Sequence, residues 1–354
     1  MYNLKKFLKK IFNKTSFIIL VLITLLCVFF FWGWFEKQYE KGIGMYYVYR
    51  GDKSYKHAEL QKAIDFYNEG LNFFPAHYGA WFNLGNIYVV CEDYYAAAEA
   101  YQNAVKYNKN FTLARMNLGI ISAVKLGDFD EAINQYQSII DSRKHLWFIP
   151  FVFSNKKSEK INRGLAYYNM GVAYRAKSLY QDGDKEHSVI YLTKAINAYR
   201  NAVKILKDDY DAYYNLALVY HLSGDYQNAG LSYCKAIEIE PMNYEAHYNL
   251  AILLRHLKMY KEALGEIEKA TILVTTGDSN KNIASYIFDV MNDLSRTLVI
   301  NNQYSYLVDK VDEKNSSNEV TYVNGKIVAT DALDRAMLEN FRTCETEKFF
   351  KEYR

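Results

Sequence analysis

The sequence predicts an all-α protein: an α-solenoid of about six helical hairpins, with one N-terminal transmembrane helix and a small C-terminal extension. Three observations predict this fold class. The 354 residues include only 17 Gly and 3 Pro, which are too few chain-breaking residues for a sandwich or a barrel. An uncharged apolar run stands near the N-terminus. A nine-residue pattern recurs along the rest of the chain, with a period near 34 residues where no insertion interrupts it.

The apolar run covers residues 17–35 and reads F-I-I-L-V-L-I-T-L-L-C-V-F-F-F-W-G-W-F. A helix of this length spans about 28 Å, close to the hydrocarbon thickness of a bilayer. Its aromatic end, with Trp32 and Trp34, is typical of a membrane interface and unlike the small-residue exit of a cleaved signal peptide. Leu26 precedes Cys27 where a lipidated cysteine would follow Gly or Ala, so we expect an uncleaved, unlipidated anchor.

The charges beside the run predict its orientation. Five lysines and no acid precede it: Lys5, Lys6, Lys9, Lys10 and Lys14. Because positively charged flanks stay in the cytoplasm, we expect residues 1–16 to form a cytoplasmic tail and residues 17–35 to cross a bacterial inner membrane. The C-terminal domain would then be periplasmic. The remainder of the chain has slightly more acids than bases, which argues against a nucleic-acid partner.

The recurring pattern begins as A-W-F-N-L-G-N-I-Y at Ala80. It returns, with substitutions, at Leu113, Ala166, Ala212 and Ala246. Asn83 and Asn117 are 34 residues apart, and so are Asn215 and Asn249. A fixed period near 34 residues with two helices per unit indicates a solenoid, in which each hairpin buries its apolar face against the next.

This pattern resembles that of the tetratricopeptide repeat family. The fifth repeat matches most fully, with Tyr213, Leu216, Ala217, Tyr220, Ala229, Tyr233, Ala236 and Pro241. The second has Trp81, Leu84, Gly85, Tyr88, Ala97, Tyr101 and Ala104. The resemblance implies six repeats over residues 44–277. In the second of them, Gly85 and Ala97 would face each other where the two helices cross, and Tyr88 and Tyr101 would fill the wedge.

Two insertions interrupt the repeats. Residues 146–163 separate the third repeat from the fourth, and residues 180–191 lengthen the fourth hairpin. The fourth hairpin is predicted to be longer because Ala195, the small residue of its second helix, comes twelve residues later than the repeat pattern requires.

After residue 277 the pattern stops, and residues 278–354 form the predicted extension. We expect a capping helix from Asn282, a short hairpin that turns at Asn324 and Gly325, and a final helix from near Asp331.

In the family that the repeats resemble, the first helix of each repeat lines a concave groove. Five repeats place an asparagine at a groove position: Asn83, Asn117, Asn169, Asn215 and Asn249. An amide offers donors and an acceptor, so this ladder could bond the backbone of an extended peptide. An equally weighted alternative is that the amides only solvate the groove and bond neighbouring backbone.

Other groove positions extend the predicted partner-binding set. Aromatic or methionine side chains come one residue before each asparagine: Phe82, Met116, Tyr168, Tyr214 and Tyr248. Asn86 and the basic residues Arg175, Arg255 and His256 complete it. Family members that clamp the acidic C-terminal peptide of chaperones use Lys and Arg where this chain has Val48, Phe82, Met116 and Asn117. That clamp is therefore absent, and we expect charge selection to come from the C-terminal half.

The apolar run W-F-I-P-F-V-F in the first insertion is a second candidate contact, through Trp147, Phe148, Phe151 and Phe153. An exposed run of this size would mark an interface. The favoured alternative is that it folds back to fill the gap left by an irregular repeat.

Motifs of catalysis are missing from the sequence. It contains no phosphate-binding loop, no H-E-x-x-H and no G-x-S-x-G, so we predict no catalytic residue, no cofactor and no metal. The cysteines Cys27, Cys91, Cys234 and Cys344 show no C-x-x-C spacing. We therefore expect neither a disulfide framework nor a zinc site.

These observations predict a non-enzymatic scaffold for protein–protein interactions in a large membrane-associated assembly, with self-association left open. One anchor, about six repeats and a Tyr-, Lys-, Asn- and Ile-rich composition resemble the collar proteins around periplasmic flagellar motors of spirochaetes. The first alternative is an adaptor that recruits a partner for envelope biogenesis or secretion. The second is an enzyme with a site in residues 278–354, which the lack of motifs disfavours.

Overall fold

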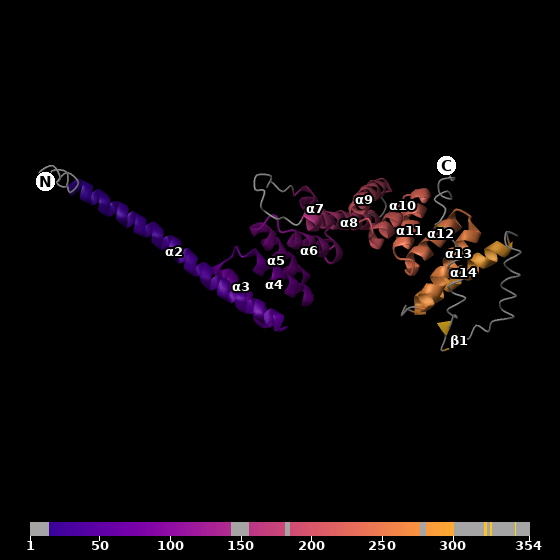
Figure 1. The fold of residues 1–354 in the computed structure, drawn as a ribbon, viewed down its shortest axis with the longest axis horizontal. Coiled ribbons are helices and arrows are strands. Elements are labelled where there is room, and N and C mark those ends of the chain that lie inside the picture. The colour runs from indigo at the N-terminus through magenta and orange to yellow at the C-terminus, as the bar shows by residue number, and fades with distance from the viewer. Residues whose placement is uncertain are drawn as a thin grey trace. The chain divides into compact units, whose positions relative to one another are not determined.

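The computed structural model describes residues 14–142, 156–180, 185–276, 281–300, 322–323, 326–327 and 344. The described chain is almost entirely helical and confirms the all-α class (Figure 1). It forms two compact units, Met1–Asp128 and Phe129–Arg354, called unit 1 and unit 2 below. The boundary falls between the two helices that the sequence assigns to the third repeat.

Unit 1 contains five helices within the described residues: α2 (Lys14–Lys56), α3 (Leu60–Phe73), α4 (Tyr78–Val90), α5 (Tyr94–Tyr107) and α6 (Thr112–Val124). α2 pairs with α3 and α4 with α5 as hairpins, and each hairpin packs on the next helix along the chain. Side-chain caps begin the helices: the amide of Ala80 donates to His77 Nδ1 at 2.9 Å, and that of Ala96 donates to Asp93 Oδ1 at 3.1 Å. Short loops and caps therefore fix where each helix starts.

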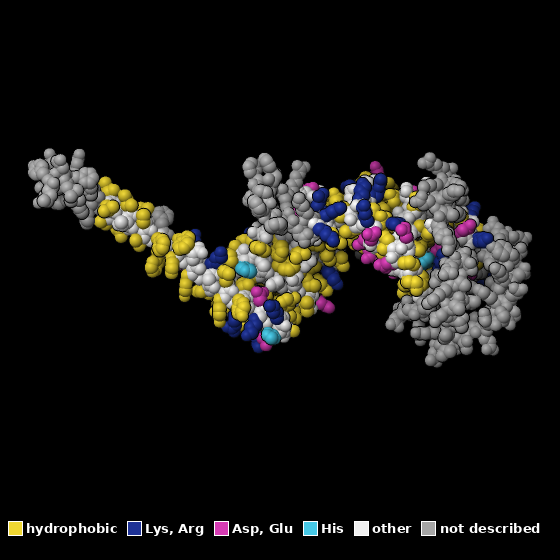
Figure 2. All heavy atoms as spheres, in the orientation of Figure 1, with side chains coloured by type: hydrophobic (Ala, Val, Ile, Leu, Met, Phe, Trp, Pro, Cys, Tyr) yellow, Lys and Arg dark blue, Asp and Glu magenta, His cyan; other side chains and the backbone are white. Residues whose placement is uncertain are grey.

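One uninterrupted helix joins the predicted anchor to the first repeat. α2 is 43 residues long, and at about 1.5 Å per residue it extends about 64 Å. Figure 2 shows hydrophobic side chains along its exposed length. From Gly44 onward it packs on the α3 hairpin, where a Cβ on Gly44 would lie 2.6 Å from Phe74 Cβ. The expected anchor and the expected first repeat thus have no loop between them.

Unit 2 contains the remaining elements. They are α7 (Phe129–Asp141), α8 (Lys156–Tyr180), α9 (Lys185–Ile205), α10 (Tyr210–Leu222), α11 (Tyr226–Ile239), α12 (Tyr244–His256), α13 (Tyr260–Thr276), α14 (Lys281–Ile300), β1 (Tyr322–Val323) and β2 (Lys326–Ile327). The pairs α8–α9, α10–α11 and α12–α13 form hairpins, and α14 packs on α13 at the place where the sequence predicts a capping helix. α14 buries Ile287 and Leu294 in the same apolar cluster as α12 and α13.

The two strands pair antiparallel, with Tyr322 opposite Ile327 and Val323 opposite Lys326. They flank the predicted hairpin turn, whose two residues lie outside the described part of the chain. The final helix expected from Asp331 also lies outside the described residues, as does most of the expected tail.

The fourth hairpin is longer than the two hairpins that follow it. α8 has 25 residues and α9 has 21, whereas α10 and α11 have 13 and 14. Both predicted insertions contribute, because α8 begins at Lys156 and α9 at Lys185. The extra turns pack on each other through the stacked rings of Tyr174 and Tyr191, whose centroids are 6.3 Å apart.

A buried tyrosine stands at the same place in the second helix of five repeats: Tyr67, Tyr101, Tyr136, Tyr199 and Tyr233. In the second repeat its ring fills the space above the helix-crossing glycine. A Cβ on Gly85 would lie 2.6 Å from Tyr101 Cε1, and the next two nearest atoms also belong to that ring. The close approach predicted at Gly85 is present, but Tyr101 makes it where the sequence suggests Ala97.

A disulfide joins Cys234 of α11 to Cys344, with their Cα atoms 5.2 Å apart. The expectation of no disulfide is therefore wrong. The two cysteines are separated by 110 residues, and both pack against the apolar cluster around α12 and α13. Their pairing depends on where the chain returns to α11, which cysteine spacing does not encode. Cys27 and Cys91 are exposed free thiols.

Candidate functional site

The groove asparagines share one face of their helices with exposed apolar side chains. Residues seven apart lie on the same side of an α-helix, so Val90 follows Asn83 and Val124 follows Asn117 on that face. Leu113 and Ile120 lie one turn before and after Asn117. These four apolar side chains are between 39% and 66% exposed. Together with Asn83 and Asn117 they define the groove face of unit 1.

The amide of Asn83 joins the second repeat to the first. Its Nδ2 donates to Asp52 Oδ1 at 3.1 Å and to the Tyr67 hydroxyl at 3.2 Å. The Tyr67 hydroxyl in turn donates to Asp52 at 2.7 Å. Burial, followed by the bond to Asp52, raises the pKa of Tyr67 above its usual range, so the hydroxyl keeps its proton.

The same network recurs one repeat later. Asn117 Nδ2 donates to Asn86 Oδ1 at 3.4 Å and to the Tyr101 hydroxyl at 3.3 Å, and Tyr101 donates to Asn86 at 2.7 Å. Each member lies 34 residues after its counterpart. The amides therefore connect adjacent repeats at the period of the solenoid.

In unit 2 the groove asparagines also donate within the chain. Asn215 Nδ2 donates to the Tyr168 hydroxyl at 3.2 Å and to the Asp211 carbonyl oxygen at 2.9 Å. Asn249 Nδ2 donates to the Tyr214 hydroxyl at 2.9 Å and to the carbonyl oxygen of Glu245 at 3.0 Å. These bonds again join consecutive repeats.

Asn169 Nδ2 donates to the carbonyl oxygen of Leu165 in its own helix at 3.0 Å. All five ladder amides thus donate inside the protein. Among the described residues, no donor bonds the Oδ1 atoms of Asn83, Asn117 or Asn249. The backbone of a bound peptide would therefore find hydrogen-bond acceptors in these asparagines. The sequence had predicted that the same side chains would offer both donors and acceptors.

The aromatic residues before the asparagines are half-buried and pack on the second-helix tyrosines. The ring centroids of Phe82 and Tyr101 are 5.7 Å apart, and those of Tyr168 and Tyr199 are 5.8 Å apart. Tyr214 packs on Tyr233 at 6.2 Å, and Tyr248 on Tyr286 at 6.2 Å. Met116 is likewise half-buried. These side chains belong first to the core, and the exposed apolar residues one or two turns away supply the free contact area.

The three basic residues of the predicted set have different surroundings. Arg255 forms an ion pair with Asp293 of α14, with Nη2 and Oδ2 2.5 Å apart. The ring of His256 lies against Tyr226, with centroids 4.7 Å apart. The half-buried Arg175 donates from Nη1 to Asn215 Oδ1 at 2.9 Å. Arg175 therefore meets a neutral amide, and no carboxylate of the described chain pairs with it.

The apolar run with Trp147, Phe148, Phe151 and Phe153 lies outside the described residues. Over the part of the chain that is described, no group of three or more His, Cys, Asp or Glu side chains could hold a metal ion.

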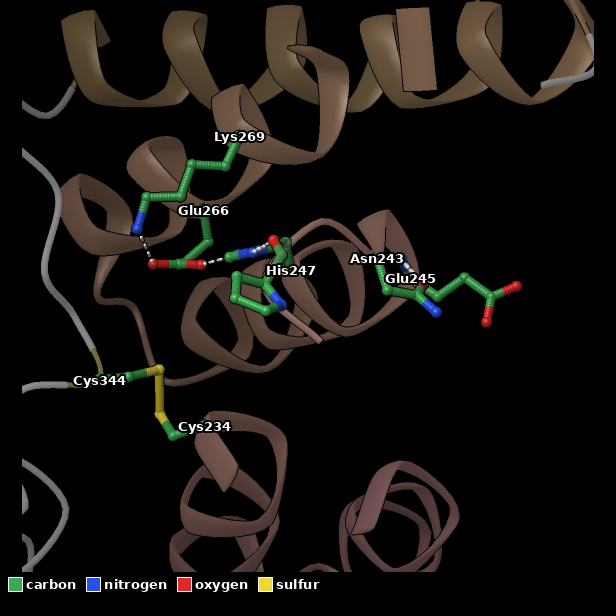
Figure 3. A network of polar contacts seen from close by, with 8 residues as sticks. Cys234, Asn243, Glu245, His247, Glu266, Lys269 and Cys344 are labelled. Carbon is green, nitrogen blue, oxygen red and sulfur yellow. Dashed lines mark hydrogen bonds and ion pairs between the residues drawn. A yellow bond between two sulfur atoms is a disulfide. The ribbon is translucent and has the colours of Figure 1, made fainter. Parts of the chain in front are cut away.

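A buried ionic network, which the sequence did not reveal, lies in the core near the C-terminal repeats (Figure 3). Glu266 stands between His247 and Lys269, with distances of 2.6 Å to His247 Nδ1 and 2.9 Å to Lys269 Nζ. All three side chains are buried. The other ring nitrogen of His247 contacts the carbonyl oxygen of Pro241 at 3.1 Å. Both ring nitrogens of His247 therefore lie within hydrogen-bond distance of an oxygen atom.

Profiles described as tetratricopeptide repeats match residues 83–145, 210–243 and 233–265, and one described as TPR repeat matches 192–224. No curated protein sequence matches the chain.

Three solved structures are similar in fold. The MamA protein is 22% identical, with a TM-score of 0.45, over 56% of this chain and 92% of that one. YrrB, described as a TPR protein with an unusual peptide-binding site, is 20% identical, with a TM-score of 0.41, over 60% and 90%. PilF of Pseudomonas aeruginosa is 13% identical, with a TM-score of 0.46, over 66% and 93%.

Proposed function

Because this chain belongs to the tetratricopeptide repeat family, we propose that it is a protein–protein interaction scaffold whose groove faces receive an extended segment of a partner. The observation that carries the proposal is the groove face of unit 1. There, exposed apolar side chains share one helix face with amide oxygens that accept no bond from the described chain. Apolar contact would supply affinity, and the amide oxygens would accept bonds from the partner's backbone N–H groups.

We further propose that residues 17–35 anchor the protein in a bacterial inner membrane, with the repeats in the periplasm. α2 is long and apolar enough to cross a membrane. The lysine-rich tail supports this orientation. The disulfide between Cys234 and Cys344 supports it independently, because disulfides persist in the periplasm and are reduced in the cytosol.

A reporter that is active only in the periplasm, fused after Arg354, is expected to be active. In the same cells, thiol labelling without reductant should modify the exposed Cys91 and leave a Cys234–Cys344 linked peptide detectable by mass spectrometry. A silent reporter, together with labelled Cys234 and Cys344, would contradict the orientation.

Within this function we propose a structural place in a large membrane-associated assembly, of the kind formed by the periplasmic flagellar motor collar. The support is the layout of one anchor continuous with a repeat solenoid. The alternative, an adaptor for envelope biogenesis or secretion, has the same layout. Crosslinking in the native cell followed by mass spectrometry separates the two by the partners recovered: motor subunits or envelope-synthesis and secretion proteins.

The groove itself is tested by replacing Val90, Leu113 and Val124 together with serine. All three are more than half exposed, so the fold should be retained while partner contact area is lost. Recovery of the crosslinked partner is expected to fall roughly tenfold or more, as for loss of an interface hot spot. Replacing the ladder asparagines is a poorer test, because their amides also join the repeats.

The matched control is Tyr95→Ser, since Tyr95 is a large side chain, 79% exposed, at the start of the second helix α5. This variant should recover the partner normally. If the triple variant folds, reaches the membrane and recovers every partner at the wild-type level, the groove face of unit 1 is not the binding surface.

A further inference from the structure

The repeats of unit 2 lack a polar partner that the repeats of unit 1 provide. In unit 1, the hydroxyl of the second-helix tyrosine donates to Asp52 or to Asn86. The matching positions in unit 2 hold Val172 and Leu218, which cannot accept a bond. The hydroxyls of the buried Tyr199 and Tyr233 accordingly have no hydrogen-bond partner in the described chain: Tyr199 and Tyr233, with Tyr210, are the buried unpaired groups found there.

A positive charge is placed among these tyrosines. Arg175 lies six residues after Asn169, at a position where unit 1 has Val89 and Ala123. Burial raises the pKa of Tyr168, Tyr199, Tyr214 and Tyr233, and the charge of Arg175 opposes that rise in each of them. Asn215 accepts a bond from Arg175 at 2.9 Å and donates to the Tyr168 hydroxyl at 3.2 Å, so its amide links the guanidinium to that tyrosine.

The donors around Arg175 outnumber the acceptors. A guanidinium has five N–H groups, and the structure gives Arg175 one side-chain acceptor, the neutral Oδ1 of Asn215. The remaining N–H groups match an anion with several lone pairs, and a guanidinium bonds a carboxylate more strongly than it bonds an amide.

The chain shows what the same position does when a carboxylate is supplied. Arg255 lies six residues after Asn249, as Arg175 does after Asn169. Arg255 forms an ion pair with Asp293, which α14 contributes. The equivalent arginine two repeats earlier has no such helix to supply the acid.

We propose that Arg175, beside Asn215, forms a carboxylate-binding site that selects an aspartate or glutamate side chain of the bound partner segment. The site rests on the proposed function, since it deepens the peptide-binding role of the groove. Arg175 is half-buried and makes the contact with the carboxylate. The carboxylate replaces the Asn215 amide as the partner of the guanidinium.

The test uses a random peptide library displayed on phage and selected on the full-length protein in detergent. Wild-type protein is expected to enrich peptides with Asp or Glu at one fixed position. For the best synthetic peptide, exchanging that acid for its amide should weaken binding roughly tenfold or more. Arg175→Gln should weaken the acidic peptide by a similar factor and leave the amide peptide unaffected. Arg175→Lys should lie between wild type and Arg175→Gln.

Arg200→Gln is the matched control, because Arg200 is exposed on α9 and should not alter binding. If the selected peptides show no preference for acids, or if Arg175→Gln binds the acidic peptide as wild type does, the carboxylate site is wrong while the groove remains a peptide site. If wild-type protein selects no peptide, the proposed function and the carboxylate site both fail. If the Arg175→Gln protein does not fold, the carboxylate site is judged from the wild-type protein alone, by comparing its binding of the acidic peptide with its binding of the amide peptide.

Discussion

Gly85→Ala is expected to destabilise unit 1 by about 1–3 kcal/mol, and Gly85→Leu by more. The reason is the tyrosine ring that covers this glycine. A single added methyl group would lie 2.6 Å from Tyr101 Cε1, so the ring or the helix crossing must shift. Tyr101 is fully buried and its hydroxyl is held by Asn86, which leaves the ring little room to move. Denaturant unfolding of the full chain in detergent, followed by circular dichroism, measures the loss.

Gly42→Ala is the control in the same unit, since no atom lies within 4 Å of a Cβ built there. It should be neutral or stabilising by up to about 1 kcal/mol, as expected for a helical glycine. Tyr101→Leu costs stability by itself, but combined with Gly85→Ala it should cost less than the sum of the two, because the clash is gone. Strict additivity of the two changes would show that the ring is not what Gly85 accommodates.

Glu266→Ala should destabilise unit 2 by about 3–5 kcal/mol, because it leaves the buried ammonium group of Lys269 and the buried ring of His247 without their shared partner. Lys269 and His247 are each below a tenth exposed and lie on opposite sides of the carboxylate. The comparison is Glu238→Ala, which removes an acid from the exposed pair with Lys235 and should cost less than about 1 kcal/mol. Equal losses in the two variants would mean that the network is not a determinant of stability.

The same carboxylate predicts an acid-dependent loss of stability. Burial alone would raise the pKa of Glu266, but the hydrogen bond from His247 and the charges of Lys269 and His247 outweigh it and lower the pKa below its ordinary value. A group with a lowered folded-state pKa contributes stability above its unfolded pKa and loses it as the pH falls through the folded value. The stability of the wild-type protein should therefore decrease as the pH drops below the ordinary pKa range of glutamate. The fall should be shallower in Glu266→Gln, measured by denaturant unfolding at a series of pH values.

Much of the helical layout could be predicted from the period of the sequence. Because the helix starts at Tyr210 and Tyr244 repeat at 34 residues, the pattern around Asn215 and Asn249 placed both helices and their inward faces. The period also predicted which side chains face the expected groove, and that assignment stays a prediction. The period could not show which atom of each asparagine amide already makes a hydrogen bond, since that depends on tyrosines contributed by the neighbouring repeat.

Contacts between distant segments were beyond the reach of the pattern. Glu266 and Lys269 look like ordinary polar residues of an amphipathic helix, and only the histidine at a position that is usually aromatic, His247, hinted at a buried polar site. The pairing of Cys234 with Cys344 was missed for the same reason. Val172 and Leu218 are also unremarkable in sequence and matter only through the buried hydroxyls of Tyr199 and Tyr233, which they leave unpaired.

α2 runs without a break from the proposed anchor into the first repeat. If residues 17–35 cross the membrane as proposed, the direction of the unit 1 groove about the membrane normal is set by the rotation of this helix. One residue added between Phe35 and Gly44 would rotate the groove by about 100° around the helix axis and move it by only about 1.5 Å along that axis. Seven added residues would restore the original orientation of the groove to within about 20° and move the groove by roughly 10 Å along the helix axis. The direction of the groove and its height above the membrane thus both depend on the same eight residues, 36–43, and a partner fixed in the membrane would sense the two separately.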